Sequence, residues 1–187
     1  MATKQESITA LVACWRAGDK HAADSLMRIV YGMLHGIAQR HIGDGVGISL
    51  SPGDLVHEAF LKLAQGVPDA ANRQHFYAIA GRAMRQVLID RERARRSVKR
   101  RGEAITLNAA GLVDPARPLD MLALEQALSE LERHDARKAR AIELRMFGGL
   151  EFDEIAEVLR ISRATLARDY RAAQAWLRVA LDLPVPA

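Results

Sequence analysis

The segment 151–178, EFDEIAEVLRISRATLARDYRAAQAWLR, decides the fold, because it holds two amphipathic helical patterns separated by a three-residue turn. The spacing predicts a first helix over 152–159, a turn at 160–162, and Ser162 as the N-cap of the second helix. The residues spaced to face inward along that second helix are Leu166, Tyr170, Ala173 and Leu177. Arginines lie on its other side. This pattern is typical of a helix-turn-helix that places one helix in the major groove of DNA.

An ordinary helical hairpin with solvated arginines would show a similar spacing, so both interpretations stand at this level. If the segment reads DNA, the outward side of its second helix would contact base edges and phosphates. The residues on that side are Ser162, Arg163, Ala164, Ala167, Arg168 and Arg171. We expect the three arginines to make the main contacts, since an arginine can hold a guanine through two hydrogen bonds.

The composition favours packed helices over a β-sandwich. Of the 187 residues, 49% are apolar and only 5% are aromatic, and strand-type alternation is nearly absent. The single cysteine, Cys14, excludes an internal disulfide and a zinc cluster built from thiolates. Its apolar neighbours predict a buried thiol. The N-terminus lacks a signal-peptide pattern and no apolar run reaches about 18 residues, so we expect a cytoplasmic protein with no membrane partner.

Basic charge is concentrated in two blocks of the chain. Residues 82–101 include nine basic and two acidic residues, and residues 160–187 include five basic and two acidic residues. Between them, residues 102–159 hold six basic and twelve acidic residues, although the whole chain carries only +4. Two separate basic surfaces indicate two contacts with one nucleic acid. The acidic segment could also cover the first basic block, but carboxylates that merely face water explain it as simply.

Helical periodicity recurs along the rest of the chain and predicts an all-α fold with two small helical domains. Besides the helix-turn-helix, the expected helices cover 6–17, 21–41, 52–65, 73–96, 120–132 and 136–147. Residues 102–119 lose the periodicity and contain two glycines and two prolines, which indicates a flexible linker. The predicted organisation is therefore a first domain at 1–101, a linker at 102–119 and a second domain at 120–184.

Three stretches in this order resemble bacterial RNA polymerase sigma factors of the extracytoplasmic function (ECF) type. They are DLVHEAFLKL at 54–63, HFYAIAGRAMRQVLIDRERARRSVKR at 75–100, and the segment 127–177 that ends in the helix-turn-helix. The resemblance covers nearly the whole chain. It implies that residues 1–101 are sigma domain 2, that residues 120–184 are sigma domain 4, and that the chain is not an enzyme and needs no cofactor or metal.

The resemblance also implies two partners, core RNA polymerase and promoter DNA. Clamp and flap-type contacts would hold the polymerase, domain 4 would recognise the minus-thirty-five element, and domain 2 would open DNA at the minus-ten element. The helix at 54–63 would dock on the clamp through Asp54, His57, Glu58 and Lys62. A capped, amphipathic surface helix with no partner is the simpler explanation of the same four residues.

The helix at 75–101 corresponds to the minus-ten reader and melting element of the family. An unstacked base can lie on an aromatic ring, and His75 and Tyr77 are the candidates, because Phe76 falls on the core stripe. Basic side chains along the helix would follow the phosphate backbone. These are Arg82, Arg85, Arg93, Arg95, Arg96, Lys99, Arg100 and Arg101.

Two positions in the helix-turn-helix depart from the family pattern. Arg160 stands where glycine is common, and a positive φ there would cost an arginine on the order of 1 kcal/mol. Glu151 begins the first helix where serine or threonine is usual. Asp153 and Glu154 would compensate in part through the helix dipole.

A third departure lies at the start of the clamp-binding helix. Family members often carry an acidic cluster there, whereas this chain has Ser51-Pro52-Gly53-Asp54, with a single carboxylate. Phosphorylation of Ser49 or Ser51 would supply about 1.5–2 negative charges. This interpretation adds a kinase as a partner, and the resemblance separately implies an anti-sigma factor, because members of the family are often held silent by a partner. Ser51 is equally explained as an N-cap with no kinase involved.

Two other classes of function compete with a sigma factor. A stand-alone regulator would bind duplex DNA as a dimer and use its first domain to sense a ligand or to dimerise, but a ligand-binding domain has no need of the basic helix at 75–101. An enzyme or metal site would draw on the histidines, which are His21, His35, His41, His57, His75 and His134. None of them stands at a metal-binding spacing such as H-E-x-x-H.

Overall fold

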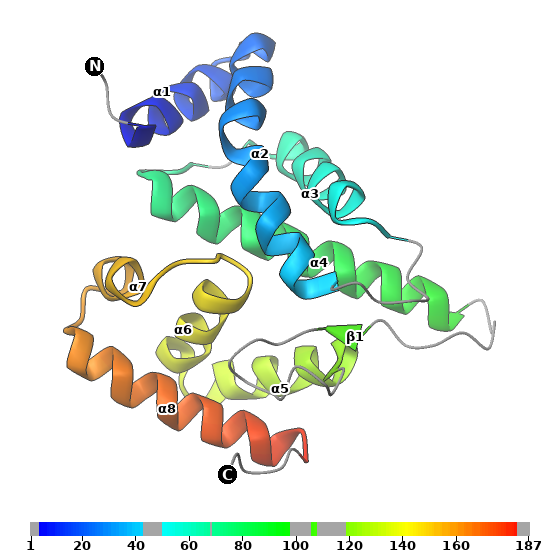
Figure 1. Cartoon of the computed structure of the whole chain (residues 1–187), viewed down its shortest axis with the longest axis vertical. Coiled ribbons are helices and arrows are strands. Elements are labelled where there is room, and N and C mark those ends of the chain that lie inside the picture. Colours follow the sequence, from blue (N-terminus) through cyan, green and yellow to red (C-terminus); the bar gives the residue numbers. More distant parts are fainter. Residues whose placement is uncertain (1–3, 43–49, 68, 98–105, 108–118, 183–187) are drawn as a thin grey trace.

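The computed structural model describes residues 4–42, 50–67, 69–97, 106–107 and 119–182. The helices in these ranges are α1 (Lys4–Arg16), α2 (Lys20–Ile42), α3 (Pro52–Gln65), α4 (Arg73–Ser97), α5 (Met121–His134), α6 (Ala136–Met146), α7 (Phe152–Leu159) and α8 (Arg163–Ala180) (Figure 1). Two short strands, β1 (Thr106–Leu107) and β2 (Leu119–Asp120), pair antiparallel. The predicted all-α class is confirmed, apart from this two-residue ladder.

Local capping signals place the helices where the sequence predicts them. Asp19 Oδ1 accepts from the backbone N–H of His21 at 2.9 Å, and Asn72 Oδ1 accepts from that of His75 at 2.8 Å. Asp120 accepts from the N–H groups of Leu122 and Ala123 at the start of α5. These side chains satisfy backbone donors that have no partner within the first turn of a helix.

Helices α1–α4, which we call the N-terminal group, share one packed interior. Leu26, Leu55 and Phe76 are fully buried in it. The ring of Trp15 stacks on that of Phe60, with the centroids 5.0 Å apart and the planes 7° from parallel. The buried residues of α2, α3 and α4 recur at the helical spacing of the sequence.

The thiol of Cys14 is exposed, so its predicted burial was wrong. The buried face of α1 is set by Ile8, Val12 and Trp15, which follow a spacing of four and three residues. Cys14 lies two residues after Val12, which turns it about 200° around the helix and away from that face. Apolar neighbours in the sequence therefore did not indicate burial here.

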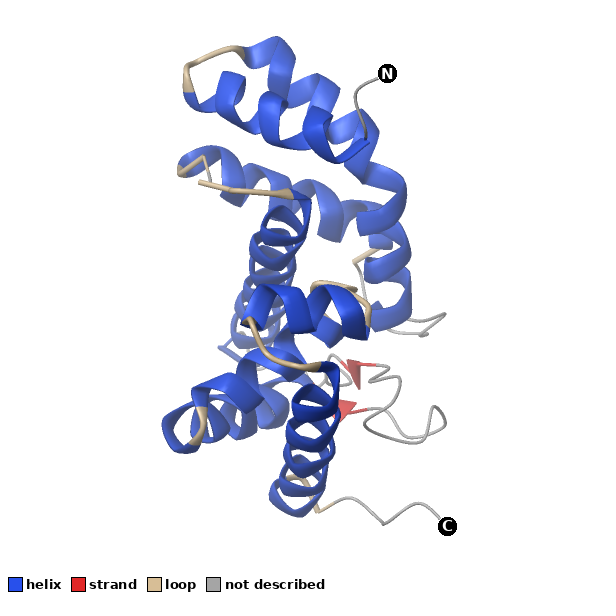
Figure 2. Cartoon of the chain, turned by 90° about the vertical axis from the view of Figure 1, so that its left-hand side faces the viewer, coloured by secondary structure: helices blue, strands red, loops and turns tan. Residues whose placement is uncertain are grey.

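Helices α5–α8, which we call the C-terminal group, pack beside the first group (Figure 2). Their interior includes Leu124, Ile142, Leu166 and Leu177, all fully buried. A buried carboxylate, Asp169, accepts from Arg137 Nε at 2.8 Å and ties α8 to α6.

The two groups touch along α4 and at the C-terminal end of α2, which crosses α4 in Figure 1; there His41 Nε2 donates to the carbonyl oxygen of Met146 at 2.6 Å. The buried apolar side chains of both groups form one continuous cluster. The turn between α6 and α7 enters the contact, and its Phe147 is fully buried. Most of the predicted linker lies outside the described residues. Within the described helices, none is long and apolar enough to cross a membrane.

Candidate nucleic-acid interface

Helices α7 and α8 form the predicted helix-turn-helix. α7 spans Phe152–Leu159, the predicted range, and α8 begins at Arg163. Ser162 caps α8 as expected, because its Oγ accepts from the backbone N–H of Thr165 at 3.1 Å. Ile161 packs partly buried against the core between the helices. The four predicted inward residues of α8 are all buried.

The first departure from the family pattern has the predicted geometry. Arg160 adopts φ 53° and ψ 46°, the left-handed conformation in which an L-residue with a Cβ is strained. At the start of α7, Glu154 Oε2 accepts from the backbone N–H of Glu151 at 2.9 Å. Glu154 thus compensates through a hydrogen bond to the backbone as well as through the helix dipole.

The outward side of α8 is open to solvent. Arg163, Ala164, Arg168 and Arg171 are exposed. Arg163 pairs with Asp153 of α7 at 3.1 Å, but both side chains are about 70% exposed, so the pair holds Arg163 only weakly. The guanidinium of Arg171 reaches back to the carbonyl oxygen of Ala167 at 3.2 Å. A helix with this surface can enter a groove without rearrangement of its own fold.

The two rings at the start of α4 that are predicted to stack with bases differ in how far they are buried. His75 is half-buried, and its Nδ1 accepts from the backbone N–H of Ala71 at 3.3 Å. Tyr77 is only 3% exposed, and burial raises the pKa of its hydroxyl. The guanidinium of Arg73 lies 5.2 Å from the centre of the Tyr77 ring and also pairs with Glu154 of α7 at 3.2 Å. A base could stack on Tyr77 only after these contacts had moved.

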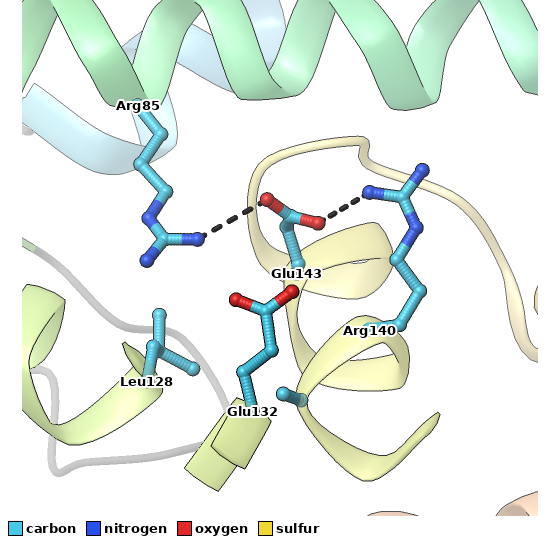
Figure 3. A pocket seen from close by; sticks show the side chains of 6 residues that line it. Arg85, Leu128, Glu132, Arg140 and Glu143 are labelled. Atoms are coloured by element: carbon cyan, nitrogen blue, oxygen red, sulfur yellow. Dashed lines mark hydrogen bonds and ion pairs between the residues drawn. The ribbon is translucent and has the colours of Figure 1, made fainter. Parts of the chain in front are cut away.

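Two of the predicted DNA-binding arginines of α4 are held by carboxylates of the C-terminal group. Glu143 of α6 accepts from Arg82 Nε at 3.0 Å and from Arg85 Nη1 at 3.1 Å, and it also pairs with Arg140. Figure 3 shows Arg85 and Arg140 reaching the carboxylate of Glu143 from opposite sides. Burial alone would raise the pKa of Glu143, but the charges of Arg140 and Arg82 outweigh it and lower that pKa. The carboxylate is therefore ionised at neutral pH and compensated by three guanidinium groups.

The order of these parts can now be set beside known families. The chain matches the family model of ECF sigma factors over residues 5–183. It belongs to the ECF sigma factor family. A search of curated proteins gave no significant match. This sigma factor directs promoter-specific transcription, its partners are core RNA polymerase and promoter DNA, and its family is not an enzyme class.

The membership decides between the interpretations of the helix-turn-helix. A solvated hairpin and a stand-alone regulator both explain α7 and α8, but neither accounts for a family match that also covers α1–α6. For the enzyme alternative, the described residues contain no group of three or more histidine, cysteine, aspartate or glutamate side chains arranged to hold a metal ion.

Two of the four polymerase-facing residues predicted on α3, Glu58 and Lys62, form ion pairs with α4. Lys62 Nζ lies 2.7 Å from Asp90 Oδ2, and Glu58 pairs with Arg91. Ser51 is the expected N-cap of α3 and forms a capping box with Asp54, and the hydrogen bonds from Ser51 lower the pKa of the Asp54 carboxyl. Asp54, Glu58 and Lys62 are therefore engaged within the sigma factor and still partly open to solvent, and His57 is exposed.

Leu61 is a candidate that the sequence interpretation missed. Its side chain is 51% exposed on the outward side of α3, between His57 and Gln65. The helical spacing of the sequence could have identified Leu61 as exposed, because the inward residues Leu55, Ala59 and Leu63 lie on a different side of the helix. A large apolar side chain at the centre of a polar face is a common anchor of a protein interface.

The basic extension of α4 is held at its end by acidic groups. Arg95 and Arg96 both pair with Glu92, whose side chain is fully buried. Arg96 also reaches Asp120, the N-cap of α5, at 2.5 Å. Arg93 is exposed. Lys99, Arg100 and Arg101 lie outside the described residues, as does Ser49.

Proposed function

We propose that this sigma factor holds its promoter at two places and the polymerase at a third. The outward side of α8 reads the minus-thirty-five duplex, the face of α4 that begins at His75 takes the opened minus-ten strand, and α3 docks on the clamp of core polymerase. Residues 1–101 and 120–184 act as sigma domains 2 and 4, and the second also makes flap-type contacts.

The observation that carries the proposal is the solvent-facing arginine surface of α8. Its inward side is fully used in packing, with Leu166, Ala173 and Leu177 at 0% exposure. The opposite side presents Arg163, Arg168 and the small residue Ala164. Small residues let the helix backbone approach base edges, while the long arginine side chains reach guanines and phosphates.

The part proposed for α4 rests on charge and position. Arg82, Arg85, Arg93 and Arg96 lie along one helix, downstream of the ring of Tyr77. A single strand tracks such a surface through its phosphates and stacks its bases on a ring. Because Tyr77 is covered in this structure, we infer that contact with the minus-ten strand requires the start of α4 to be uncovered.

The docking of α3 on the polymerase combines apolar and polar contacts. Leu61 supplies an exposed apolar centre, and Asp54, His57, Glu58 and Lys62 surround it with both signs of charge. An apolar centre with a charged rim is the usual composition of a specific protein interface. The ion pairs of Glu58 and Lys62 with α4 keep these side chains oriented before the partner arrives.

The test is transcription by reconstituted holoenzyme from a library of randomised promoters. Arg168→Ala and Arg171→Ala should each change the base preferred at one position of the upstream element. The expected loss is about 1–3 kcal/mol of discrimination, or about 5- to 150-fold between bases.

Arg133→Ala is the matched control, because Arg133 is an exposed arginine of the C-terminal group on α5, outside the helix-turn-helix. It should leave the promoter preference unchanged. If the two α8 variants lowered transcription equally from all promoters, as a general loss of positive charge would, the assignment of α8 as the upstream reader would be wrong.

A further inference from the structure

One arginine on the outward side of α8 is held by a carboxylate from another helix. Arg163 Nη1 lies 3.1 Å from Asp153 Oδ1 of α7 and donates to Asp153 Oδ2 at 3.3 Å, so a single nitrogen contacts both oxygens. Neither Arg168 nor Arg171 pairs with a carboxylate of the described residues, and Arg171 Nε bonds to the carbonyl oxygen of Ala167 in its own helix. Arg163 is thus the arginine of this surface whose direction is set from outside α8.

The first turns that carry the two paired side chains are fixed by contacts of their own. At the start of α8, Ser162 Oγ accepts from the backbone N–H of Thr165 at 3.1 Å, and the two hydroxyl oxygens lie 2.9 Å apart. At the start of α7, Arg145 Nη1 of α6 lies 2.8 Å from Glu151 Oε2. The backbone positions from which the pair extends are therefore set before DNA binds.

The spacing between α7 and α8 is set by packing directly behind the pair. The ring of Phe152, the residue before Asp153, meets the ring of Tyr170 edge-on, with the centroids 5.1 Å apart and the planes at 66°. Ile155 of α7 and Leu166 of α8 are fully buried. Because close-packed side chains resist sliding, Asp153 keeps its place beside the first turn of α8.

The pair occupies one end of the guanidinium group and leaves the other end open. Within the described part of the chain, Nε and Nη2 of Arg163 have no hydrogen-bond partner. A guanidinium presents its N–H groups in a fixed planar fork, and two of them can bind O6 and N7 of a guanine. Because Asp153 holds Nη1, the edge formed by Nε and Nη2 remains for the base.

The pair is weak in the free protein and becomes stronger in a DNA groove. The side chains of Arg163 and Asp153 are 70% and 73% exposed, so water screens their charges. A helix in the major groove displaces that water, and the attraction of two charges rises about fourfold when the effective dielectric constant falls from about 80 to about 20. Orienting a long side chain in advance is worth about 2- to 10-fold in affinity.

We propose that Asp153 is a positioning residue for base recognition, which directs the free edge of Arg163 toward a guanine of the upstream element. The proposal rests on the proposed function, and it names an arginine of α8 whose direction is fixed and the group that fixes it. The carboxylate has an opposite effect on affinity, because its charge repels the phosphates of any duplex that α8 enters. Asp153 therefore raises discrimination at one base pair and lowers affinity for duplex DNA of every sequence.

The first experiment measures base preference with reconstituted holoenzyme and the library of randomised promoters. Arg163→Ala should abolish the preference for guanine at one upstream position, and Asp153→Ala should lower it about 2- to 10-fold at the same position. Adding Asp153→Ala to Arg163→Ala should cause no further change there, because the carboxylate then has no arginine to direct. Glu130→Ala is the matched control, since it removes an exposed carboxylate from α5, outside the helix-turn-helix.

The second experiment measures binding of the full chain to a labelled, random-sequence duplex at increasing salt. Without Asp153, the guanidinium of Arg163 can neutralise a phosphate, so Asp153→Ala should raise the affinity and steepen the slope of log K against log salt by about 0.9. Glu130→Ala should leave the slope unchanged. A purely structural role of Asp153 predicts the reverse, because a destabilised α7 would weaken binding to every sequence and lower the melting temperature.

The outcomes separate the positioning role from the function it rests on. If Arg163→Ala changed the preferred base while Asp153→Ala left both the preference and the slope unchanged, positioning would be refuted and α8 would remain the upstream reader. The same conclusion would follow if only Arg168→Ala or Arg171→Ala changed a preferred base. If none of the three arginine variants did, the proposed function itself would fail. Should Asp153→Ala not fold, Asp153→Asn removes the charge at nearly constant volume, and the same loss of preference is required of it.

Discussion

The backbone N–H of Ile161 donates to the carbonyl oxygen of Ala156 at 3.0 Å, across the left-handed residue Arg160. The N–H of Arg160 donates in turn to the carbonyl oxygen of Glu157 at 3.1 Å. This pair of bonds is the Schellman motif that ends many helices, and its left-handed position usually holds glycine. The turn of the helix-turn-helix therefore has the geometry of a glycine turn and carries an arginine.

Arg160→Gly should stabilise the protein. The left-handed conformation costs a residue with a Cβ about 1–2 kcal/mol, and part of the gain is offset by the greater freedom of glycine in the unfolded chain. We expect a net increase of about 0.5–1 kcal/mol in the free energy of unfolding, measured by urea denaturation. Arg160→Ala is the control, because alanine keeps the Cβ and should give no such gain. Equal effects of the two variants would mean that the left-handed turn stores no strain.

Leu61→Asp should weaken binding to core polymerase without destabilising the sigma factor. The Leu61 side chain is half exposed, so little packing is lost within the chain. Burying the exposed half of a leucine side chain contributes about 1 kcal/mol, and a charge in its place adds a desolvation cost, so we expect a loss of affinity of at least about tenfold.

Ala10→Asp is the control for Leu61→Asp, since Ala10 is an exposed apolar residue of α1, outside α3 and outside the domain proposed to make flap-type contacts. Binding can be measured with labelled protein and purified core enzyme, beside a thermal melt of each variant. Equal affinities for the parent and the Leu61 variant would remove this residue from the docking surface.

Local features of the structure were predictable from the sequence, because the groups that decide them lie within one turn of each other. The caps Asp19, Ser51, Asn72 and Ser162 each bond to a backbone N–H two or three residues ahead. A capping side chain and the donor it satisfies are visible in the same few letters.

For the contact between the two groups of helices, the sequence allowed only the attraction between acidic and basic segments to be predicted. The acidic segment does reach the basic block, but which carboxylate meets which arginine depends on residues about sixty positions apart, such as Arg82 and Glu143. A glycine within a helix, such as Gly81, is unfavourable by propensity, and the close approach of the Phe147 backbone explains it. Helical periodicity states which side of a helix is apolar, and it does not state what packs against that side.

Ser51→Ala should destabilise the N-terminal group. Ser51 Oγ accepts from the backbone N–H of Asp54 at 3.1 Å, and Asp54 Oδ2 accepts from the N–H of Ser51 at 3.0 Å. Loss of an N-cap serine costs about 1 kcal/mol, while Ser51→Asp keeps an acceptor at the cap and should cost less. Urea denaturation of the two variants measures this difference.

The same two variants test the proposed phosphorylation of Ser51. The hydroxyl donates to Asp54 Oδ2 at 2.7 Å, so a phosphate would place new negative charge beside that carboxylate, at the N-terminus of α3. If charge at this position controls docking, Ser51→Asp should bind core polymerase differently from Ser51→Ala. If both variants bound like the parent, the serine would be a cap alone.

Stability should fall as the pH drops from about 6.5, because His41 is buried as a neutral ring. Burial, and secondarily the charge of Arg40, lower the pKa of His41 from 6.5 to about 4, although the hydrogen bond to Met146 acts in the opposite direction. Its Nδ1 is buried with no hydrogen-bond partner among the described residues, so a proton there would remain unsatisfied. The unfolded chain therefore binds the proton first, and the stability lost between the two pKa values is about 3 kcal/mol.

The measurement is the free energy of unfolding at pH 7 and pH 5, where His41 should account for a loss of about 2 kcal/mol. The carboxylate of Glu143 has a lowered pKa and contributes a further loss only at lower pH, as the carboxyl groups begin to take up protons. His41→Gln keeps a donor for Met146 but cannot be protonated, so it should flatten the pH dependence in this window. His21→Gln, at an exposed position of the same helix, should leave it unchanged. A His41→Gln variant with the parent's slope would show that another group controls the acid sensitivity of the folded protein.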